Sequence, residues 1–582
     1  MIESGVLTDA GDHFTVAGPV APLAIPTSLH ASLLARLDRL APVREVAQIG
    51  AALGRSFSHE LISSVAGMPQ QKLNEALDQL ASAELVFRRG TPPDAEYTFK
   101  HALVQDAAYS TLLRSRRQQL HGRIATTLES RFPEIVAVHP ELMAQHCAKA
   151  GMLEKAVEYQ LKAGRQAVKR WAMTEAMAQL QRGLDLLASL PDADWHRQQE
   201  LDLRMALGRA LFATKGYAAP TAGETLARAR ALAEQLDRSD CLGPLLYGRW
   251  LFHVNRSELK LALSFAERLE RIGEAHDDDR LLLLGHLVHG ISRMNLGDFV
   301  AARVLFERCH RLDDPAHRAV YAGIAMADPH HQMLKFLGST LTWLGYIDQG
   351  RARLNQALKD ARQHGHLYTL AFVLSYEGWF ESATRSPQEI QRHAEEAVAL
   401  STEHDFPLML AHGIVTRGWA LTALGQAHEG LALITKGLSM NRATGAVVNT
   451  LSMLTSAAEA YAKLGQPVEG LNCLAEAAQI IESTDERIAE TDVYRLRGDL
   501  LNATGDQAAA EESYHQAVAV ARRQSAKLFE LRAATSLARL WRHQGKPQQA
   551  RELLAPIYGW FTEGFDTLDL KEAKALLEQL KA

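Results

Sequence analysis

A pattern of small and bulky apolar residues repeats every 40 residues over the C-terminal part of the chain. Each repeat is marked by one position, usually glycine, which we call the hinge. The hinge positions are Ser257, Gly297, Gly345, Arg385, Gly425, Gly465, Gly505 and Gly545. Successive hinges are 40 residues apart, except for a step of 48 between Gly297 and Gly345. A fixed period of this size is typical of repeat architectures, in which each unit packs only on its neighbours.

The positions around each hinge repeat as well. From the second unit on, a small residue stands seven positions before the hinge: Gly290, Gly338, Gly378, Gly418, Ala458, Gly498 and Ala538. Nine positions after it stands a bulky residue in every unit but that of Arg385, which has Ala394 instead: Phe306, Leu354, Ile434, Leu474, Tyr514 and Leu554. Small residues also predominate at offsets of 5 and 12 after the hinge. Offsets of 5, 9 and 12 fall near one face of a helix. The pattern predicts two closely packed antiparallel helices joined by a left-handed turn at the hinge.

The region before this array, residues 25–131, has a different pattern. Apolar periodicity predicts helices over residues 29–40, 42–53 and 58–65, the last capped by Ser58, and a fourth after Met68-Pro69. Two short strands follow at residues 85–88 and 96–99, joined by the turn sequence of residues 90–94. Helices closed by a β-hairpin indicate a winged helix. Further helices are expected from residue 100 and over residues 116–129.

Composition agrees with a globular protein rich in helix. The chain has 582 residues, 47% of them hydrophobic and 23% charged, with a net charge of −5. This charge provides no global basic field for nucleic acid or anionic lipid. No apolar run approaches the roughly 18 residues of a membrane span, and no secretory signal is visible at the N-terminus. The four dispersed cysteines fit a reducing cytosol, so we expect a cytoplasmic protein.

The repeat resembles the tetratricopeptide repeat (TPR), although its period of 40 residues exceeds the 34 typical of that family. The strings at residues 25–40, 99–121, 526–534 and 559–567 resemble bacterial signal-transduction ATPases that are linked to class III adenylate or guanylate cyclases and carry TPR repeats. The resemblance implies four parts. They are residues 1–24, the end of an ATPase domain; 25–131, a winged helix and following helices; 132–244, degenerate helical hairpins; and 245–582, TPR-like repeats.

The nucleotide-binding part of that family is missing from this sequence. The sequence contains no G-x-x-x-x-G-K-[ST] motif to hold nucleotide phosphates, and it does not include the cyclase domain of that family. The motifs H-E-x-x-H, G-x-S-x-G and G-x-G-x-x-G are absent too. We therefore expect a non-catalytic chain without a cofactor. It is either a natural truncation or a regulatory half whose upstream part is encoded separately.

Metal binding is not predicted either. Histidines cluster at His286 and His289, at His330 and His331, and at His364 and His366. No cysteine or carboxylate joins them at ligand spacing, so packed or surface histidines explain them better. The acidic run of residues 277–279 lacks the spacing of an EF-hand and reads as a solvated helix end.

The winged helix offers one alternative function, DNA binding by a transcription regulator. The helix that would enter the groove carries Lys72, Glu75 and Asp78, a net charge of −1, whereas groove reading needs cations for the phosphates. A basic cluster follows the β-hairpin region, at Arg114, Arg116, Arg117 and Arg123. It could contact phosphates or an acidic protein surface. The resembled ATPases instead pack this domain on their nucleotide domain, and we favour that role.

The array provides the leading functional hypothesis. In TPR folds the first helix of each hairpin lines a groove, and positions two, three and six before the hinge face it. Trp379 and Trp419 stand at the sixth position in adjacent repeats, followed by Glu459 and Asp499, while Trp343 stands two before its hinge. Tryptophan is enriched among interface hot spots. The tryptophans therefore either anchor a protein or peptide partner, with Glu459 and Asp499 as an acidic rim, or pack between hairpins. The sequence favours an all-α TPR-like solenoid that binds a partner and regulates an ATPase or cyclase.

Overall fold

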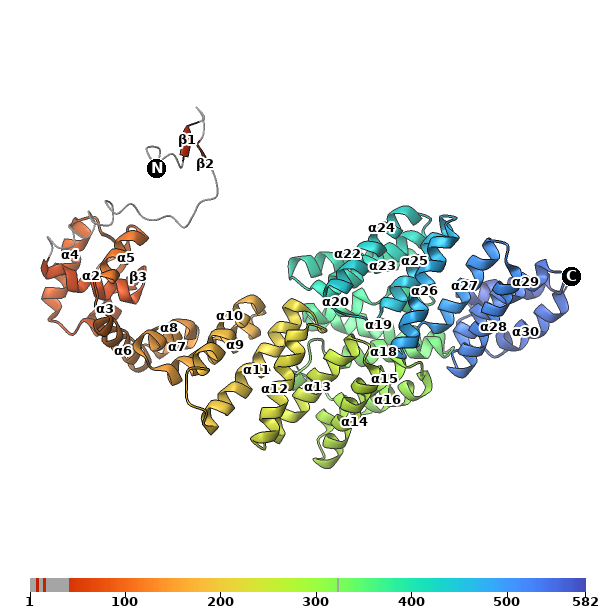
Figure 1. Ribbon diagram of the computed structural model, residues 1–582, viewed down its shortest axis with the longest axis horizontal. Helices are drawn as coiled ribbons and strands as arrows, with labels where there is room; N and C mark the ends of the chain where they lie inside the picture. The colour runs from red at the N-terminus through yellow and green to blue at the C-terminus, as the bar shows by residue number, and fades with distance from the viewer. Residues whose placement is uncertain (1–6, 10–13, 17–40, 322–323, 582) are drawn as a thin grey trace. The chain divides into compact units, whose positions relative to one another are not determined.

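The computed structural model describes residues 7–9, 14–16, 41–321 and 324–581. Its contacts divide the chain into two units: residues 1–163 with 182–191, and residues 164–181 with 192–582. We call them unit 1 and unit 2 and describe each by itself (Figure 1). The helix predicted over residues 29–40 lies outside the described residues, as does most of the expected ATPase remnant. Two short strands, β1 (Leu7–Asp9) and β2 (Phe14–Val16), form an antiparallel pair.

In its described residues, unit 1 contains the later helices and the hairpin predicted for a winged helix. Met68-Pro69 precedes α4 as expected, and Ser58 caps α3 by accepting a hydrogen bond from the Leu61 N–H at 3.1 Å. The elements are α2 (Ala41–Leu53), β3 (Ser56–Ser58), α3 (His59–Ala66), α4 (Gln70–Ser82), β4 (Val86–Arg89), β5 (Glu96–Phe99), α5 (Ala102–Ser110), α6 (Arg114–Arg131), α7 (Pro133–Val138) and α8 (Pro140–Ala150). The residues of α9 (Leu153–Lys169) and α10 (Met173–Leu187) are divided between the units.

The sequence pattern missed strand β3. It pairs antiparallel with β5, giving a sheet of order β3-β5-β4. Phe57 alone of its residues is buried, and its ring stacks on Tyr97 with centroids 5.8 Å apart. Three residues are too few to show an alternating pattern, so this strand is visible only through its partner.

Unit 2 is an all-α, TPR-like array of paired helices (Figure 1). Its further helices are α11 (Asp194–Lys215), α12 (Pro220–Gln235), α13 (Ser239–Asn255), α14 (Leu259–Ala275), α15 (Asp279–Asn295), α16 (Phe299–Arg311), η1 (Pro315–His317), α17 (Arg318–Tyr321), α18 (Pro329–Trp343), α19 (Ile347–His364), α20 (Leu367–Ser375), α21 (Gly378–Glu381), α22 (Pro387–Glu403), α23 (Pro407–Ala423), α24 (Ala427–Ala443), α25 (Thr450–Lys463), α26 (Pro467–Thr484), α27 (Glu490–Ala503), α28 (Gln507–Arg523), α29 (Lys527–His543), α30 (Pro547–Gly559) and α31 (Leu568–Gln579). The 48-residue step contains η1, α17 and the longer loop expected there. Among the described residues, no helix is long and apolar enough to cross a membrane.

The predicted hinges are turns with a left-handed residue. Gly425 has φ +89° and Ser257, which lacks the freedom of glycine, has φ +53°. At the hinges of Gly297, Gly345, Gly425 and Gly505, the glycine seven positions before the hinge packs against the bulky residue nine positions after it. A Cβ added to Gly498 would lie 2.5 Å from the ring of Tyr514, and one added to Gly290 would lie 2.6 Å from that of Phe306. The spacing therefore reports the contact between the two helices of each hairpin.

One hinge is wrong. At Arg385 the structure has no left-handed turn, and the preceding helix is interrupted between α20 and α21. Arg385 donates from Nε to a carboxylate oxygen of Glu381 at 2.6 Å and is almost completely buried. Burial of this ion pair, rather than a turn residue, shapes the repeat.

Successive turns of the array contact each other. The backbone oxygen of Asn255 accepts hydrogen bonds from the N–H groups of Val447 at 2.8 Å and Val448 at 3.2 Å. In the same way, the oxygen of Asn295 accepts from the N–H of Arg487 at 2.7 Å. Later repeats thus pack on the helix ends of much earlier repeats. This contact buries surfaces that a more open array would expose.

Replacing Gly418 by alanine tests the close approach of α23 and α24. The added Cβ would lie 2.6 Å from the backbone oxygen of Gly430. Helix propensity favours alanine by about 1 kcal/mol, but overpacking costs about 1–3 kcal/mol. We expect a net loss of about 1 kcal/mol in the free energy of unfolding, measured by urea denaturation followed by circular dichroism. Gly559→Ala is the control, because nothing lies within 4 Å of its added Cβ. Equal stability of the two variants would contradict the prediction.

Candidate functional site

Two of the three tryptophans considered as partner anchors, Trp343 and Trp419, are buried. Trp343 is 1% exposed, and its ring lies 5.2 Å from that of Phe299 and 5.9 Å from that of Phe529. Of the two alternatives left open by the sequence, packing holds for Trp343 and an exposed anchor does not, because a ring from a much later repeat covers it. Trp379 belongs to α21, and its side chain lies outside the part of the chain that the structure describes. Trp419 is 8% exposed.

The structure brings Trp419 and Glu459 together. The indole N–H of Trp419 donates to Glu459 Oε2 at 3.3 Å, and both residues line a cleft of about 540 Å³ that we call the polar cleft. Lys463 and Arg539 also line it. The cleft is therefore not an acidic rim, since both cations and carboxylates line its wall.

Asp499 is held within its own repeat. It accepts hydrogen bonds from Arg495 Nη1 at 2.9 Å and from the Tyr514 hydroxyl at 2.7 Å. These bonds stabilise the carboxylate in place, and its side chain keeps 33% exposure. Asp499 therefore neighbours the polar cleft through Arg495, which lines it.

The basic cluster of unit 1 lies on and around the start of α6. Arg116 forms an ion pair with Glu45 at 3.1 Å, and Arg117 lies over the ring of Tyr109 at 4.7 Å. In the helix expected to enter a DNA groove, Asp78 is ion-paired with Arg88 at 2.5 Å. Parts of the basic surface are thus engaged in contacts within unit 1.

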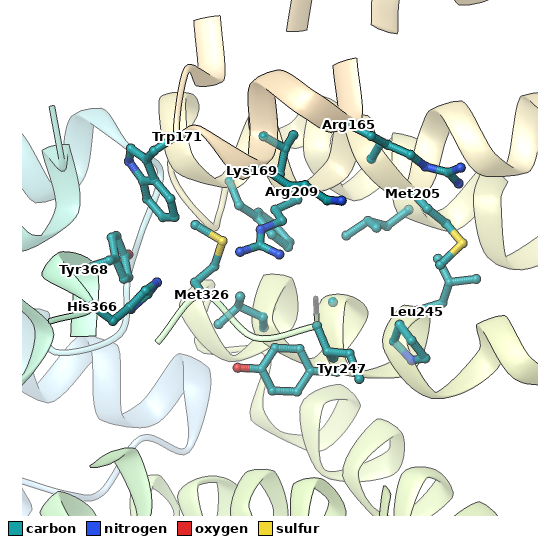
Figure 2. Close-up of a pocket in the computed structure, with 18 of the residues that line it drawn as sticks. Arg165, Lys169, Trp171, Met205, Arg209, Leu245, Tyr247, Met326, His366 and Tyr368 are labelled. Atoms are coloured by element: carbon teal, nitrogen blue, oxygen red, sulfur yellow. The ribbon is translucent and has the colours of Figure 1, made fainter. Parts of the chain in front are cut away.

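A further site was not visible in the sequence. Unit 2 contains a cavity of about 1130 Å³, which we call the aromatic cavity (Figure 2). Its wall comes from the C-terminal end of α9, from α11, α12 and α13, from the start of α20, and from the segments between helices at residues 170–171, 238, 324–326, 365–366 and 404–406. Arg209 extends into the cavity, with Trp171, His366 and Tyr368 on one side and Met205 and Leu245 on the other (Figure 2).

Trp171 occupies a backbone conformation that usually holds glycine. It follows α9 with φ +61°, and the Ala172 N–H donates to the Ala167 oxygen at 2.9 Å, which is the bond of a Schellman motif. Its ring lies 5.5 Å from those of Tyr368 and Phe406. A bulky residue in this conformation costs roughly 1–2 kcal/mol, and such strain concentrates at functional sites.

Cations outnumber carboxylates along the cavity wall. The cations are Arg165, Lys169, Arg170, Arg209 and Arg238, and the carboxylates are Asp202 and Asp240. Arg165 is paired with Asp202 at 3.0 Å and Arg238 with Asp240 at 2.7 Å. Burial lowers the pKa of the Arg209 guanidinium, while Tyr217 and Tyr247 act in the opposite direction. Burial, followed by Arg209, also lowers the pKa of His366, which favours its neutral form.

The cavity has no local sequence signature, because its residues come from segments far apart in the chain. Trp171 was the available signal, since it stands where a turn glycine is expected. Among the described residues, no group of three His, Cys, Asp or Glu side chains could hold a metal ion. The paired histidines instead contact carboxylates: His286 and His289 both bind Glu270, at 2.6 and 2.8 Å.

Comparisons with known proteins find similarity at low sequence identity. No protein-family model matches it. It is 24% identical over 540 residues to the uncharacterized protein R02095 of Rhizobium meliloti (strain 1021), a match that covers 88% of this chain and 49% of that protein. The chain thus spans about half the length of this curated relative.

Two solved structures are similar to the chain at low identity. One is a Rap protein complexed with competence and sporulation factor, with 14% identity and a TM-score of 0.46, covering 64% of this chain and 99% of that one. The other is a signal transduction ATPase with numerous domains and a tetratricopeptide repeat sensor from Pyrococcus horikoshii. It has 11% identity and a TM-score of 0.32, covering 88% of this chain and 68% of that one.

Proposed function

We propose that this chain is the non-catalytic binding region of a signalling protein that contains an ATPase or nucleotide cyclase. Its array takes up a protein or peptide partner at the polar cleft. The observation that carries this proposal is the cleft itself, whose wall includes Trp419, Glu459 and Arg539, the residues six positions before three hinges. Three of these repeating positions thus line one cleft, which supports a solenoid that binds an extended partner.

The partner site is tested by substitution at this surface. A partner captured by cross-linking to the wild-type chain is bound to the double variant Trp419→Ala/Glu459→Gln, and the dissociation constants are compared by calorimetry. We expect affinity to fall at least about tenfold, because a buried aromatic anchor and its polar neighbour are lost together. Arg442→Gln is the control, since Arg442 pairs with Glu476 on another surface. Unchanged affinity in a folded double variant would refute the site.

The DNA-binding alternative has weaker support. The helix α4 would place Glu75 and Asp78 against phosphates, and Arg88 is ion-paired with Asp78. Phosphate contacts by cations dominate affinity for DNA. A gel shift that weakens steeply with salt would favour DNA over a protein partner.

A further inference from the structure

The aromatic cavity is a second site, separate from the proposed partner cleft. Among the described residues, the two share no lining residue. Pockets that enclose small organic ligands have volumes of roughly 300–1,000 Å³ and are mostly apolar with a few polar groups. A volume of about 1130 Å³ therefore has room for a ligand of that size together with some water.

One side of the cavity is a platform for a flat ring. Trp171, Tyr368 and Phe406 form a mutual cluster, in which the rings of Tyr368 and Phe406 lie 5.0 Å apart. Tyr368 is fixed from behind by a hydrogen bond between its hydroxyl and that of Tyr217. Trp171 is half-buried, so part of its ring faces the cavity. The backbone cost of a tryptophan at φ +61° is retained although asparagine or glycine would remove it.

The polar side of the cavity suits an oxyanion. Arg170 pairs at 3.2 Å with Glu175, which does not line the cavity, so its charge is balanced from outside the wall. Lys169 and Arg209 are further cations of the wall beyond the two that pair with Asp202 and Asp240. Arg209 projects into the centre of the space (Figure 2). A guanidinium binds a carboxylate or phosphate with two parallel hydrogen bonds, and this interaction strengthens where water is excluded. The overall charge of the chain is −5, so the positive wall is a local feature.

We propose that the aromatic cavity binds a small organic anion, whose flat aromatic or apolar body stacks on Trp171 while its carboxylate or phosphate contacts Arg209. The site recognises the combination of the two groups. A neutral molecule with the same body gains the stacking alone, and an inorganic anion gains the charge interaction alone.

The test uses three probes that share one ring system: 2-naphthoate, 2-naphthyl phosphate and the neutral 2-naphthalenemethanol. Calorimetry on the full chain should show that at least one anion binds about tenfold or more tightly than the neutral probe, because hydrogen bonds to charged groups contribute about 1.5–3 kcal/mol. The two anions distinguish a carboxylate ligand from a phosphate ligand. No binding of any probe, or equal binding of anionic and neutral probes, would overturn the proposal.

Variants separate the two halves of the site. Arg209→Gln should remove the preference for the anion, and Arg209→Lys should retain part of it. Trp171→Gly should weaken all three probes, while glycine suits the backbone at this position. The control is Arg249→Gln, because burial also lowers the pKa of Arg249, which lies over Phe265 outside the cavity wall. If Arg249→Gln changes binding as much as Arg209→Gln does, or if folded Trp171→Gly binds like wild type, the proposal is wrong.

Discussion

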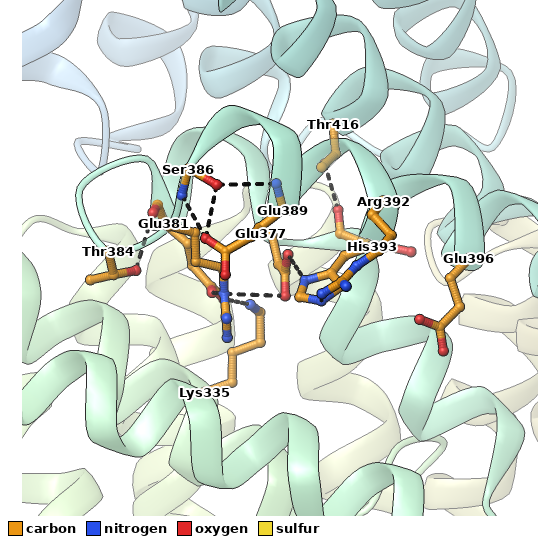
Figure 3. Close-up of polar contacts among 12 residues, drawn as sticks. Lys335, Glu377, Glu381, Thr384, Ser386, Glu389, Arg392, His393, Glu396 and Thr416 are labelled. Carbon is orange, nitrogen blue, oxygen red and sulfur yellow. Dashed lines mark hydrogen bonds and ion pairs between the residues drawn. The ribbon is translucent and has the colours of Figure 1, made fainter.

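Replacing Lys335 by methionine should lower the free energy of unfolding of unit 2 by about 3–5 kcal/mol, because it leaves a buried carboxylate without its nearest cation. Lys335 and Glu381 are both 1% exposed and form an ion pair (Figure 3). Burial alone would raise the pKa of Glu381, but Lys335 and Arg385 together hold it below its ordinary value. The same cluster contains Glu377, whose carboxylate contacts His393 Nδ1 at 2.7 Å. Urea denaturation at neutral pH measures the loss.

Two controls identify the cause of that loss. Arg442→Met breaks the ion pair with Glu476 in which both side chains are about half exposed, and it should cost less than about 1 kcal/mol. The double variant Lys335→Met/Glu381→Gln removes the charge that the single variant leaves behind, so it should recover part of the stability. If the single variant is as stable as Arg442→Met, the buried ion pair is not what holds this irregular repeat.

The hairpins could be predicted from the sequence because their contacts are local. Gly498 and Tyr514 belong to one repeat, so the spacing that places them in contact recurs along the chain. The helices and the hairpin described in unit 1 could be predicted for the same reason, since Ser58 caps the helix that begins beside it. A period in the sequence reports interactions within the period.

Contacts between turns of the array could not be predicted. Trp343 is buried by Phe529, and no repeat rule relates these two positions. The aromatic cavity could not be predicted either, because Trp171, Tyr368 and Phe406 are far apart in the sequence and meet only when the array winds back on itself. The period predicts which residues face inward but not what they meet there.

The string at residues 559–567 illustrates how such a contact is made. The sequence presents it as a family resemblance without a role. In the structure Glu563 accepts hydrogen bonds from the N–H groups of Asp348 at 3.0 Å and Gln349 at 3.2 Å, the start of α19. The Gly564 N–H donates in return to Asp348 Oδ2 at 3.0 Å. A carboxylate from the end of the array thus caps a helix far earlier in the chain and joins the two.

Replacing Glu486 by glutamine should stabilise the protein at pH 8 and have little effect at pH 4. Glu486 is completely buried at another contact between turns, where it accepts a hydrogen bond from the Ser257 hydroxyl at 2.6 Å and one from the Asn449 N–H at 3.2 Å. Burial raises the pKa of this carboxyl to about 7, although both hydrogen bonds lower it. The folded state therefore favours the protonated form.

The sign of the pH dependence follows from that preference. Below the ordinary pKa of 4.5 the carboxyl is protonated in both folded and unfolded chains, and its contribution to stability is fully present. That contribution falls as the pH rises from this value and is lost once the pH passes about 7. The total loss of stability is about 3 kcal/mol. Glutamine has the same shape and no charge, so it avoids this loss. Denaturation of both proteins at pH 4, 6 and 8 should show a difference that grows across the series, whereas the exposed Glu482→Gln on α26 should show none. A constant difference between wild type and Glu486→Gln would mean that the carboxyl is not held in its protonated form by the fold.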